Sequence, residues 1–363
     1  MKHFRRIAAL LLALCFCLGA ALADDGVTTI KGTVKTSIKL RKSYPDNPVI
    51  EGVSSTTGLP ASGETYTPIV LVLDGGAYPH WGIMDADIVF QVPNQGKGNT
   101  KLLALFADHY PEQAGGSRSA RASMLPIAAA WDAAFCSAGR APVESANVNV
   151  DALARKWGLR MKGDSYKMFD LLSSNTSWRV RKEDVSAPGN LSCFVRNIHE
   201  ELAAREDMTF EERPFLFTDD PRTEGATAEW IKIMHRGDDP KGTVNAASTS
   251  YFEYDPEQGG YVRSYSEGVD ADRYTGEVPV YANVLVIRVK FKWQSGYLYY
   301  TGHLTGSGCC EIFQNGRYVQ GAWYRKDVNS RLVFVGPDGQ ELEMQRGKTF
   351  IVVANDASTV QYK

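Results

Sequence analysis

The sequence predicts an α+β protein in two parts: a mixed sheet with packed helices, followed by an antiparallel, β-rich part. Two observations carry this prediction. Between residues 67 and 217, apolar runs of strand length occur together with helix-like patterns. After residue 225, short β-branched and aromatic runs follow one another, and Asn315-Gly316 and Asp338-Gly339 are strong hairpin turns. We place the boundary in the polar stretch TDDPRTEGAT, residues 218–227.

Residues 1–23 have the pattern of a secretory signal peptide. Three basic residues precede an apolar run from Ile7 to Leu18, and Ala21-Leu22-Ala23 offers a cleavage site before Asp24. The apolar run is short for a retained membrane anchor. The two cysteines in this segment do not follow the small residue that a lipoprotein signal needs. We therefore expect an extracytoplasmic protein, secreted or associated with the cell envelope after cleavage near Ala23.

The composition excludes several classes of protein. Cleavage removes three of the 40 Lys and Arg residues and leaves 37 against 42 Asp and Glu, a net charge of −5. A general nucleic-acid binder would carry a basic excess instead. No segment after residue 23 is long and apolar enough to cross a membrane. We expect no nucleic-acid partner and no transmembrane segment in the mature chain.

Four cysteines remain after cleavage: Cys136, Cys193, Cys309 and Cys310. An extracytoplasmic location permits disulfides, but the spacings match no disulfide framework, and adjacent cysteines seldom bond to each other. Thiols are favoured, and the disulfide state stays open. Because no C-x-x-C or H-x-x-x-H spacing occurs, the sequence predicts no metal site. It gives no sign of a cofactor.

Residues 24–66 are rich in Thr, Ser, Gly and Pro and are predicted to form an extended lead-in segment. A first domain is expected at residues 67–217, with Ser117 or Ser119 as a helix cap and Pro126 in the first turn of a longer helix. Its predicted strands are 68–76, 85–93 and 100–110, the last with a helix as the alternative, and its further predicted helices are 152–157, 166–172 and 191–205. One face of the helix after Pro126 is predicted to carry a core-facing stripe: Ile127, Ala130, Trp131, Ala134 and Phe135. A second domain is expected at residues 225–357.

Charged residues gather around GGSRSAR, residues 115–121. Glycines let a backbone come close to a ligand, and two arginines three positions apart share one face of a helical turn. The start of a helix adds amide donors for an anion. Asp74 follows the first strand, at the strand end where ligand-contacting residues often lie. The predicted ligand-binding residues are Asp74, Asp87, Lys101, Arg118, Ser119 and Arg121.

An ordered series of short motifs resembles the YerB-like family. The segments are TGLP (57–60), PIVLVLDGG (68–76), YPHWGIMDADIVFQ (78–91), NTKLLALF (99–106) and GGSRSAR (115–121). In the second domain the matching residues are Tyr254, Asp255, Gly260, Tyr261, Arg263, Asp270, Asn283, Gly306-Ser307-Gly308, Phe313, Gly316, Gly321 and Trp323. The resemblance covers residues 57–356. It implies an extracytoplasmic bacterial protein, often a lipoprotein, with an N-terminal and a C-terminal domain of unassigned function.

The chain departs from the family pattern at several positions. Gly75, Tyr78, Gln91, Lys101 and Gly116-Ser117 stand where the family usually has Asn, Arg, Glu, Arg and Pro-Val. If the family used a carboxylate at position 91 as a base, this chain has lost it. The Arg-Ser-Ala-Arg run at 118–121 matches, so the arginines are the strongest part of the predicted site.

Three functions fit this cluster. The first is binding of an anionic envelope ligand or partner, such as a cell-wall polymer, because arginine recognises carboxylate and phosphate in two-point geometry. Tyr78, Trp81 and Trp323 could then stack on sugars. In the structural alternative, the aspartates and arginines are internal ion pairs that tie helix to sheet.

The second function is a hydrolase or transferase that acts on cell-wall material. It would use Asp74 or Asp87 as a general base and Ser119 as a nucleophile, with His80 or Lys101 as the base next to the serine. No G-x-S-x-G elbow is present. The third function is a non-catalytic envelope scaffold whose β-rich part contacts partners. The sequence favours binding over catalysis.

Overall fold

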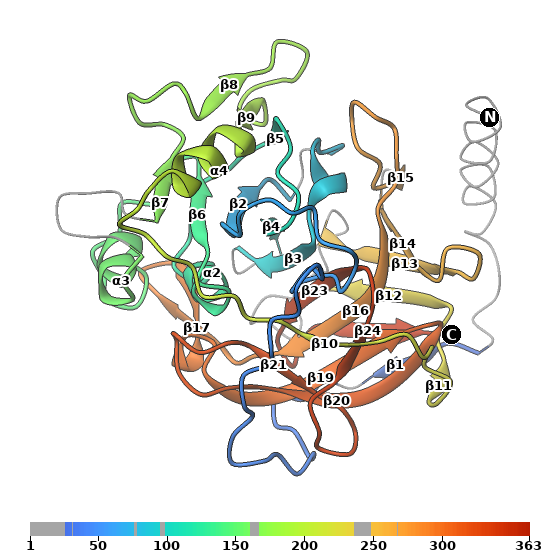
Figure 1. Cartoon of the computed structure of the whole chain (residues 1–363). Coiled ribbons are helices and arrows are strands. Elements are labelled where there is room, and N and C mark those ends of the chain that lie inside the picture. Colours follow the sequence, from blue (N-terminus) through green and yellow to red (C-terminus); the bar gives the residue numbers. More distant parts are fainter. Residues whose placement is uncertain are drawn as a thin grey trace.

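A 17-stranded mixed sheet runs through the protein and takes strands from both predicted parts (Figure 1). This computed structural model describes residues 26–30, 32–75, 78–94, 99–159, 167–235, 248–266 and 268–363. The predicted signal peptide lies outside the described residues. The protein is mostly β, and the large mixed sheet confirms the coarser part of the predicted fold class.

The first part contributes one end of this sheet: β2 (Ile69–Leu73), β3 (Ile88–Pro93), β4 (Thr100–Phe106), β6 (Ala134–Ser137) and β7 (Met168–Asp170). Strand β4 pairs antiparallel with both β2 and β3, while β2 pairs parallel with β6, and β6 with β7. A separate three-stranded sheet consists of β5 (Ala114–Gly115), β9 (Leu191–Cys193) and β8 (Arg179–Arg181). The strands predicted around residues 69, 88 and 100 are thus confirmed.

The second part supplies most of the remaining strands. In the large sheet these are β11 (Ala226–Thr227), β12 (Trp230–Met234), β13 (Ser250–Asp255), β14 (Gly260–Tyr265), β15 (Gly268–Val269), β16 (Val280–Arg288), β19 (Gly306–Gln314), β20 (Arg317–Arg325), β21 (Val333–Val335), β23 (Lys348–Ala354) and β24 (Thr359–Tyr362). Two small sheets pair β17 (Phe291–Gln294) with β18 (Tyr297–Tyr300), and β10 (Leu216–Thr218) with β22 (Glu343–Gln345). The predicted turn at Asn315-Gly316 joins β19 to β20, and Asn315 has a φ of 49° there.

The two predicted parts meet inside the sheet rather than at a linker. Strand β3 of the first part pairs in parallel with β23 of the second, from Ile88 opposite Thr349 to Gln91 opposite Val352. Strand β23 in turn pairs in parallel with β16. Backbone hydrogen bonds therefore continue without a break from β7 at one end to the C-terminal strands (Figure 1).

Both faces of the central strands are covered. All five residues of β2 are fully buried; Ile69, Leu71 and Leu73 face one hydrophobic core, and Val70 and Val72 face the other. Each core contains side chains from both parts of the chain: Ile287 and Ile351 lie in one, Val284 and Phe350 in the other. Strands buried on both faces have continuous apolar sequences, which is why PIVLVL predicts its strand well.

Among the described residues, the helices are fewer and shorter than the sequence predicts. They are α2 (Leu125–Ala130), α3 (Val150–Lys156) and α4 (Val195–Ala203), with short 3₁₀ turns η2 (Ile83–Asp85) and η4 (Thr301–His303). Pro126 lies in the first turn of α2 as predicted. The sequence predicts that Ser117 or Ser119 caps an earlier helical turn, but residues 117–121 are not helical and Ser117 forms a β-bridge with Leu73, so this expectation is wrong. Ala134 and Phe135 belong to β6, residues 168–170 are a strand instead of a helix, and residues 191–193 form β9 ahead of α4.

The lead-in segment packs along the second part. Its strand β1 (Thr28–Ile30) pairs antiparallel with β24, from Thr28 opposite Tyr362 to Ile30 opposite Val360. Further on, the Tyr44 hydroxyl donates to the Gly339 carbonyl over 3.1 Å. The described residues of this segment are therefore attached to the body of the protein at several points.

Candidate anion-binding site

The end of β2 brings three stretches of chain together. Asp74 directly follows β2, and Lys101 is the second residue of the antiparallel neighbour β4, whose Leu102 lies opposite Leu73. On the other side, the Asp74 amide donates to the Gly116 carbonyl and the Arg118 amide donates to the Val72 carbonyl, both over 2.9 Å. Because these backbone bonds fix GGSR beside the strand end, the Arg118 side chain meets Asp74.

Arg118 and Asp74 form a salt bridge through the Arg118 Nε atom. Their side chains are 28 % and 16 % exposed, so the pair lies at the surface of the fold and its outer edge is open to solvent. Asp74 therefore lies beside Arg118, and the contact agrees equally with the structural alternative, in which the pair ties a loop to the sheet.

Lys101 is buried beside this pair, with an exposed fraction of 7 %. The pKa of Lys101 is lowered to about 8, mainly by burial; Asp74 opposes this shift, and the nearby Arg118 and Arg121 guanidiniums add to it. Within the described part of the chain, the ammonium has no hydrogen bond and no salt bridge. The enclosure of the side chain removes part of the hydration of this ammonium without supplying a paired partner, which disfavours the charged form.

Arg121 completes a group of three cations. One of its terminal nitrogens, Nη1, donates to the Ala120 carbonyl over 2.8 Å, and its guanidinium carbon lies 5.7 Å from the ring centre of Tyr297. Its Nε atom is buried without a hydrogen-bond partner among the described residues, and burial lowers the pKa of Arg121. Asp74 is thus accompanied by Lys101, Arg118 and Arg121, and the cluster carries an excess of positive charge.

Asp87 lies away from this cluster. It precedes β3, and Ile88 pairs with Leu105 near the far end of β4, whereas Lys101 lies near its start. Asp87 is buried and accepts hydrogen bonds from the Thr56 hydroxyl (3.0 Å) and from the backbone amides of Ala107 (2.9 Å) and Asp108 (3.1 Å). Burial raises its pKa to about 6. These contacts make Asp87 a structural carboxylate that fastens the lead-in segment and the turn after β4.

Ser119 lies between the two arginines, but no general base contacts its hydroxyl among the described residues. Its carbonyl accepts a long hydrogen bond of 3.4 Å from Arg121 Nη1. Within the described residues, its hydroxyl makes no hydrogen bond with His80 or Lys101. His80 is fully buried, and its Nε2 atom lies 2.6 Å from the Asp74 carbonyl oxygen. The nucleophile and base that the enzyme hypothesis needs are therefore not in contact.

A buried polar network behind Asp74 was not predicted. His80 Nδ1 lies 4.0 Å from Asp270 Oδ1, and Asp270 forms a salt bridge with Arg263, both 1 % exposed. Arg263 also donates to the hydroxyls of Tyr78 (3.0 Å) and Ser250 (3.1 Å). The family motif includes Arg263 and Asp270, but no sequence spacing could place Arg263 beside Tyr78, 185 positions earlier.

The network continues to Gln91, the residue that stands for the family glutamate. Ser250 donates to the Gln91 side-chain oxygen over 2.8 Å, and Gln91 donates to the Thr100 hydroxyl over 3.1 Å. An amide with both ends hydrogen-bonded holds the sheet together and, unlike a carboxylate, cannot act as a general base at neutral pH.

The aromatic residues proposed to stack on sugars are engaged inside the protein. Trp81 and Trp323 are each 2 % exposed, and their indole nitrogens donate to Ser192 Oγ (2.8 Å) and to the Arg288 carbonyl (2.9 Å). Tyr78 stacks on Tyr265 with ring centres 3.8 Å apart. The prediction of sugar stacking by the two tryptophans is wrong, because a buried indole has no free face.

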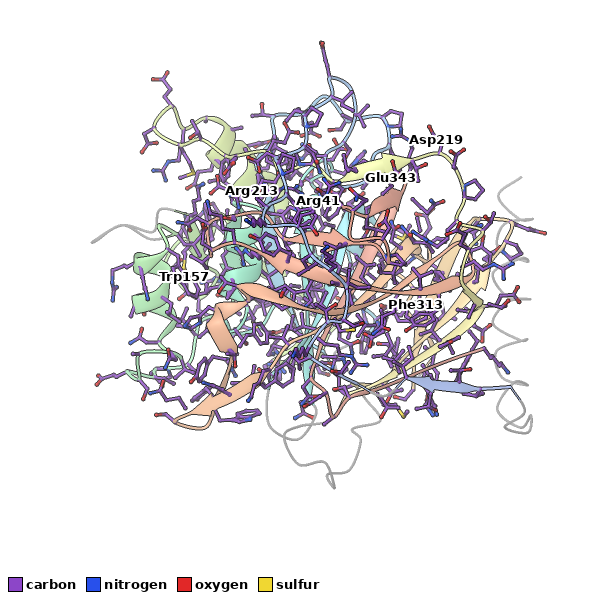
Figure 2. All side chains as sticks on the ribbon, turned by 90° about the horizontal axis from the view of Figure 1, so that it is seen from below. Arg41, Trp157, Arg213, Asp219, Phe313 and Glu343 are labelled. Carbon is purple, nitrogen blue, oxygen red and sulfur yellow. The ribbon has the colours of Figure 1, made fainter. Side chains whose placement is uncertain are left out.

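A groove of about 790 Å³ lies elsewhere, between the lead-in segment and residues 216–224 and 336–345. Figure 2 labels two of its lining residues, Arg41 from the lead-in segment and Glu343 from β22. None of the six predicted site residues lines this groove. The groove and the cationic cluster are therefore separate features.

No group of three or more potential metal ligands gathers in the described portion of the chain. Among the helices of that portion, none has the length and apolar character of a membrane span.

The fold places this protein in a structural class whose members have an N-terminal and a C-terminal part joined by one mixed sheet.

Two sequence profiles match this chain. They are the N-terminal domain of DUF3048 over residues 56–208 and its C-terminal domain over residues 242–351, both of unknown function. The chain belongs to this YerB-like family. It is 25 % identical to "Putative lipoprotein YerB" of Bacillus subtilis over 295 residues, which cover 80 % of this chain and 81 % of that protein. The crystal structure of YerB from Bacillus subtilis superposes with a TM-score of 0.68 and 22 % identity, and the match covers 85 % of this chain and 99 % of that one.

Proposed function

We propose that this protein is exported and binds an anionic ligand of the cell envelope through Lys101, Arg118 and Arg121. The observation that carries the proposal is the surplus of positive charge beside a single carboxylate. It includes Lys101, whose side chain is largely buried and whose ammonium has no partner among the described residues. An anionic ligand would supply the missing partner. Carboxylate and phosphate groups fit best, because two guanidiniums offer forked donors.

The envelope location rests on the signal-peptide pattern and on a relative whose name describes a lipoprotein. Asp74 then has a supporting role, since its salt bridge holds the Arg118 guanidinium in one orientation. Ser119 offers a hydroxyl at the edge of the cluster. Asp87 supports the fold and does not face the ligand.

Binding is favoured over the two alternatives. A hydrolase or transferase would need a base in contact with Ser119, and the described contacts provide none. A pure scaffold would not require a cation buried at a cost. The same cost argues against a purely structural role for Lys101, although it leaves the Arg118–Asp74 pair compatible with one.

The substitution Arg118→Gln tests the proposal. The mature chain, residues 24–363, is titrated with inorganic pyrophosphate by calorimetry and incubated with purified, insoluble cell-wall material. We expect Arg118→Gln to weaken both interactions at least tenfold and to change the free energy of unfolding by less than about 1 kcal/mol, because the salt bridge is partly exposed.

Arg196→Gln is the matched control, because Arg196 is also 28 % exposed and also forms a salt bridge, with Glu64. Equal binding by the two variants would contradict the proposed site. A large loss of stability in Arg118→Gln alone would show that the pair is structural.

A further inference from the structure

Two cysteines from distant parts of the sequence meet in the core behind the cationic cluster. Cys136 lies in β6, opposite Leu71 of β2 and Phe169 of β7. Cys193 ends β9, in the small sheet that covers this side, opposite Ala114 of β5. Both side chains are fully buried in the same hydrophobic core.

Several contacts show that β9 lies over the face of the sheet that carries Cys136. The neighbours of the two cysteines touch, because the rings of Phe169 and Trp178 pack edge to face with centres 4.9 Å apart, and the Phe194 amide donates to the Trp178 carbonyl. The Cys193 thiol is close enough to the Cys136 thiol to contribute to the rise of its pKa. The two cysteines thus lie in one buried core and come from two packed layers of the fold.

We propose that Cys136 and Cys193 form a disulfide bond in the exported protein. The proposal rests on the export that is part of the proposed function. The structure holds both residues as thiols, together with buried Cys309 and Cys310. In an oxidising compartment a neighbouring pair of thiols is a substrate for a dithiol-disulfide oxidant.

The reaction is a thiol–disulfide exchange. One thiolate attacks the disulfide of the oxidant and forms a mixed disulfide; the second thiolate then attacks the protein sulfur of that mixed disulfide and releases the oxidant as a dithiol. The two cysteines lose two electrons and two protons, which the oxidant takes up, and one S–S bond forms.

The timing follows from burial. Burial raises the pKa of the Cys136 thiol far above its ordinary range, so the folded protein contains almost no thiolate at this position. Oxidation must therefore precede closure of the core, while the chain is still folding. Once formed, the bond would be shielded from reductants by the same burial.

The bond would fasten the candidate site. Strand β9 holds GGSR in place, because the Ser117 amide donates to the Leu191 carbonyl over 2.7 Å, and β6 pairs with the strand that ends at Asp74. The cross-link would join these two supports across 57 positions of sequence. Closing a loop of this length restricts the unfolded chain and should stabilise the fold.

Cys309 and Cys310 provide an internal control. They are adjacent in β19, where successive side chains point to opposite faces, and Gln320 donates to the Cys309 sulfur over 3.0 Å. Neither is expected to be oxidised with the other or with the proposed pair.

The experiment is a count of thiols in the denatured mature chain. The protein is prepared by export from cells and, in parallel, by refolding with a glutathione redox buffer, and is then alkylated with iodoacetamide without reduction and digested. We expect alkylation at Cys309 and Cys310 only, together with a disulfide-linked peptide pair that contains Cys136 and Cys193. Reduction should lower the melting temperature of the wild type by several degrees and leave the variant C136A/C193A unchanged.

Alkylation of all four cysteines in both preparations, or any other pairing, would overturn the proposal. The thiol count does not depend on ligand binding, so it can fail while the anion site is confirmed. The refolded sample gives an answer even if the chain is not exported, and C309A/C310A is the variant expected to keep the response to reduction.

Discussion

Burial decides the chemistry of individual residues at the end of β2. Arg118 and Lys101 carry the same charge and lie near the same aspartate, yet Arg118 is partly exposed and paired, and Lys101 is enclosed and lacks a pairing partner among the described residues. The enclosure lowers the pKa of Lys101 to about 8. A lysine in the sequence gives no sign of this difference, because it depends on neighbours from β2 and from residues 116–121.

This lowered pKa predicts the pH dependence of anion binding. Lys101 is protonated at pH 7 and about nine-tenths neutral at pH 9, so the site loses one positive charge over this interval. Affinity for pyrophosphate should fall up to about tenfold from pH 7 to pH 9. The variant Lys101→Arg stays charged and should show a much flatter profile, which titration calorimetry at both pH values can measure.

The same shift has the opposite effect on stability. The pKa of Lys101 is lower in the folded protein than in the unfolded chain, so the unfolded chain binds more protons between about pH 8 and 10. The unfavourable contribution of Lys101 to the stability of the fold is therefore fully present below pH 8 and fades as the pH rises.

The binding measurement can contradict the prediction for Lys101. A wild-type affinity that does not change with pH, or that changes as it does in Lys101→Arg, would show that Lys101 does not face the ligand.

At the scale of the elements, pairing between strands overrides local propensity. The alanine-rich run after Pro126 predicts a helix up to Phe135, but α2 ends at Ala130, and Asp132 adopts a positive φ of 51°. Residues 134–137 instead form β6, which fills the position between β2 and β7. Helix propensity is a weak preference, and two ladders of backbone hydrogen bonds outweigh it.

Strand direction also explains why Asp74 and Asp87, which the sequence predicts to share one site, lie apart. Strand β4 is antiparallel to both β2 and β3, so β2 and β3 run in the same direction. Asp74 follows β2 and Asp87 precedes β3, and they consequently lie at opposite ends of the sheet. The sequence predicts each strand correctly, but the separation of the two aspartates follows only from the order in which the strands pair.

Buried salt bridges between strands supply another test. Arg288 of β16 pairs with Glu311 of β19 over 2.9 Å, with exposed fractions of 0 % and 2 %. Glu311→Ala leaves the Arg288 charge buried and without its carboxylate. We expect a loss of about 3–5 kcal/mol in the free energy of unfolding, measured by urea denaturation.

Asp219 offers the matched control for this measurement. It pairs with Arg346 over 2.6 Å but is 80 % exposed, and Figure 2 shows it near the edge of the molecule. Asp219→Ala should cost less than about 1 kcal/mol. Equal effects of the two substitutions would mean that the buried pair contributes no more than a surface pair.

At the scale of the whole molecule, the shared sheet predicts that the two parts fold together. Without β23, strand β3 would lose its parallel neighbour, and both hydrophobic cores would lose side chains from β16 and β23. The fragment 24–217 should therefore stay unfolded or aggregate by itself, and the complete mature chain should show one cooperative thermal transition by differential scanning calorimetry.

The domain boundary at residues 218–227 stays a prediction. The calorimetry tests whether the parts on either side of it unfold independently. Mixing the fragments 24–217 and 225–363 during refolding should restore near-ultraviolet circular dichroism. Two separate transitions in the complete chain, or a well-folded first fragment, would show that each part is an independent folding unit.

The pairing of β1 with β24 has a consequence for how the protein can be attached to other structures. Thr28 lies opposite Tyr362, so both ends of the described chain leave from the same edge of the sheet. Any anchor, tag or fused protein, at either terminus, would hold the body by this one edge. The cationic cluster lies at the end of β2, several strands away in the same sheet. The distance between the cluster and this edge is therefore fixed by the hydrogen-bonded strands between them.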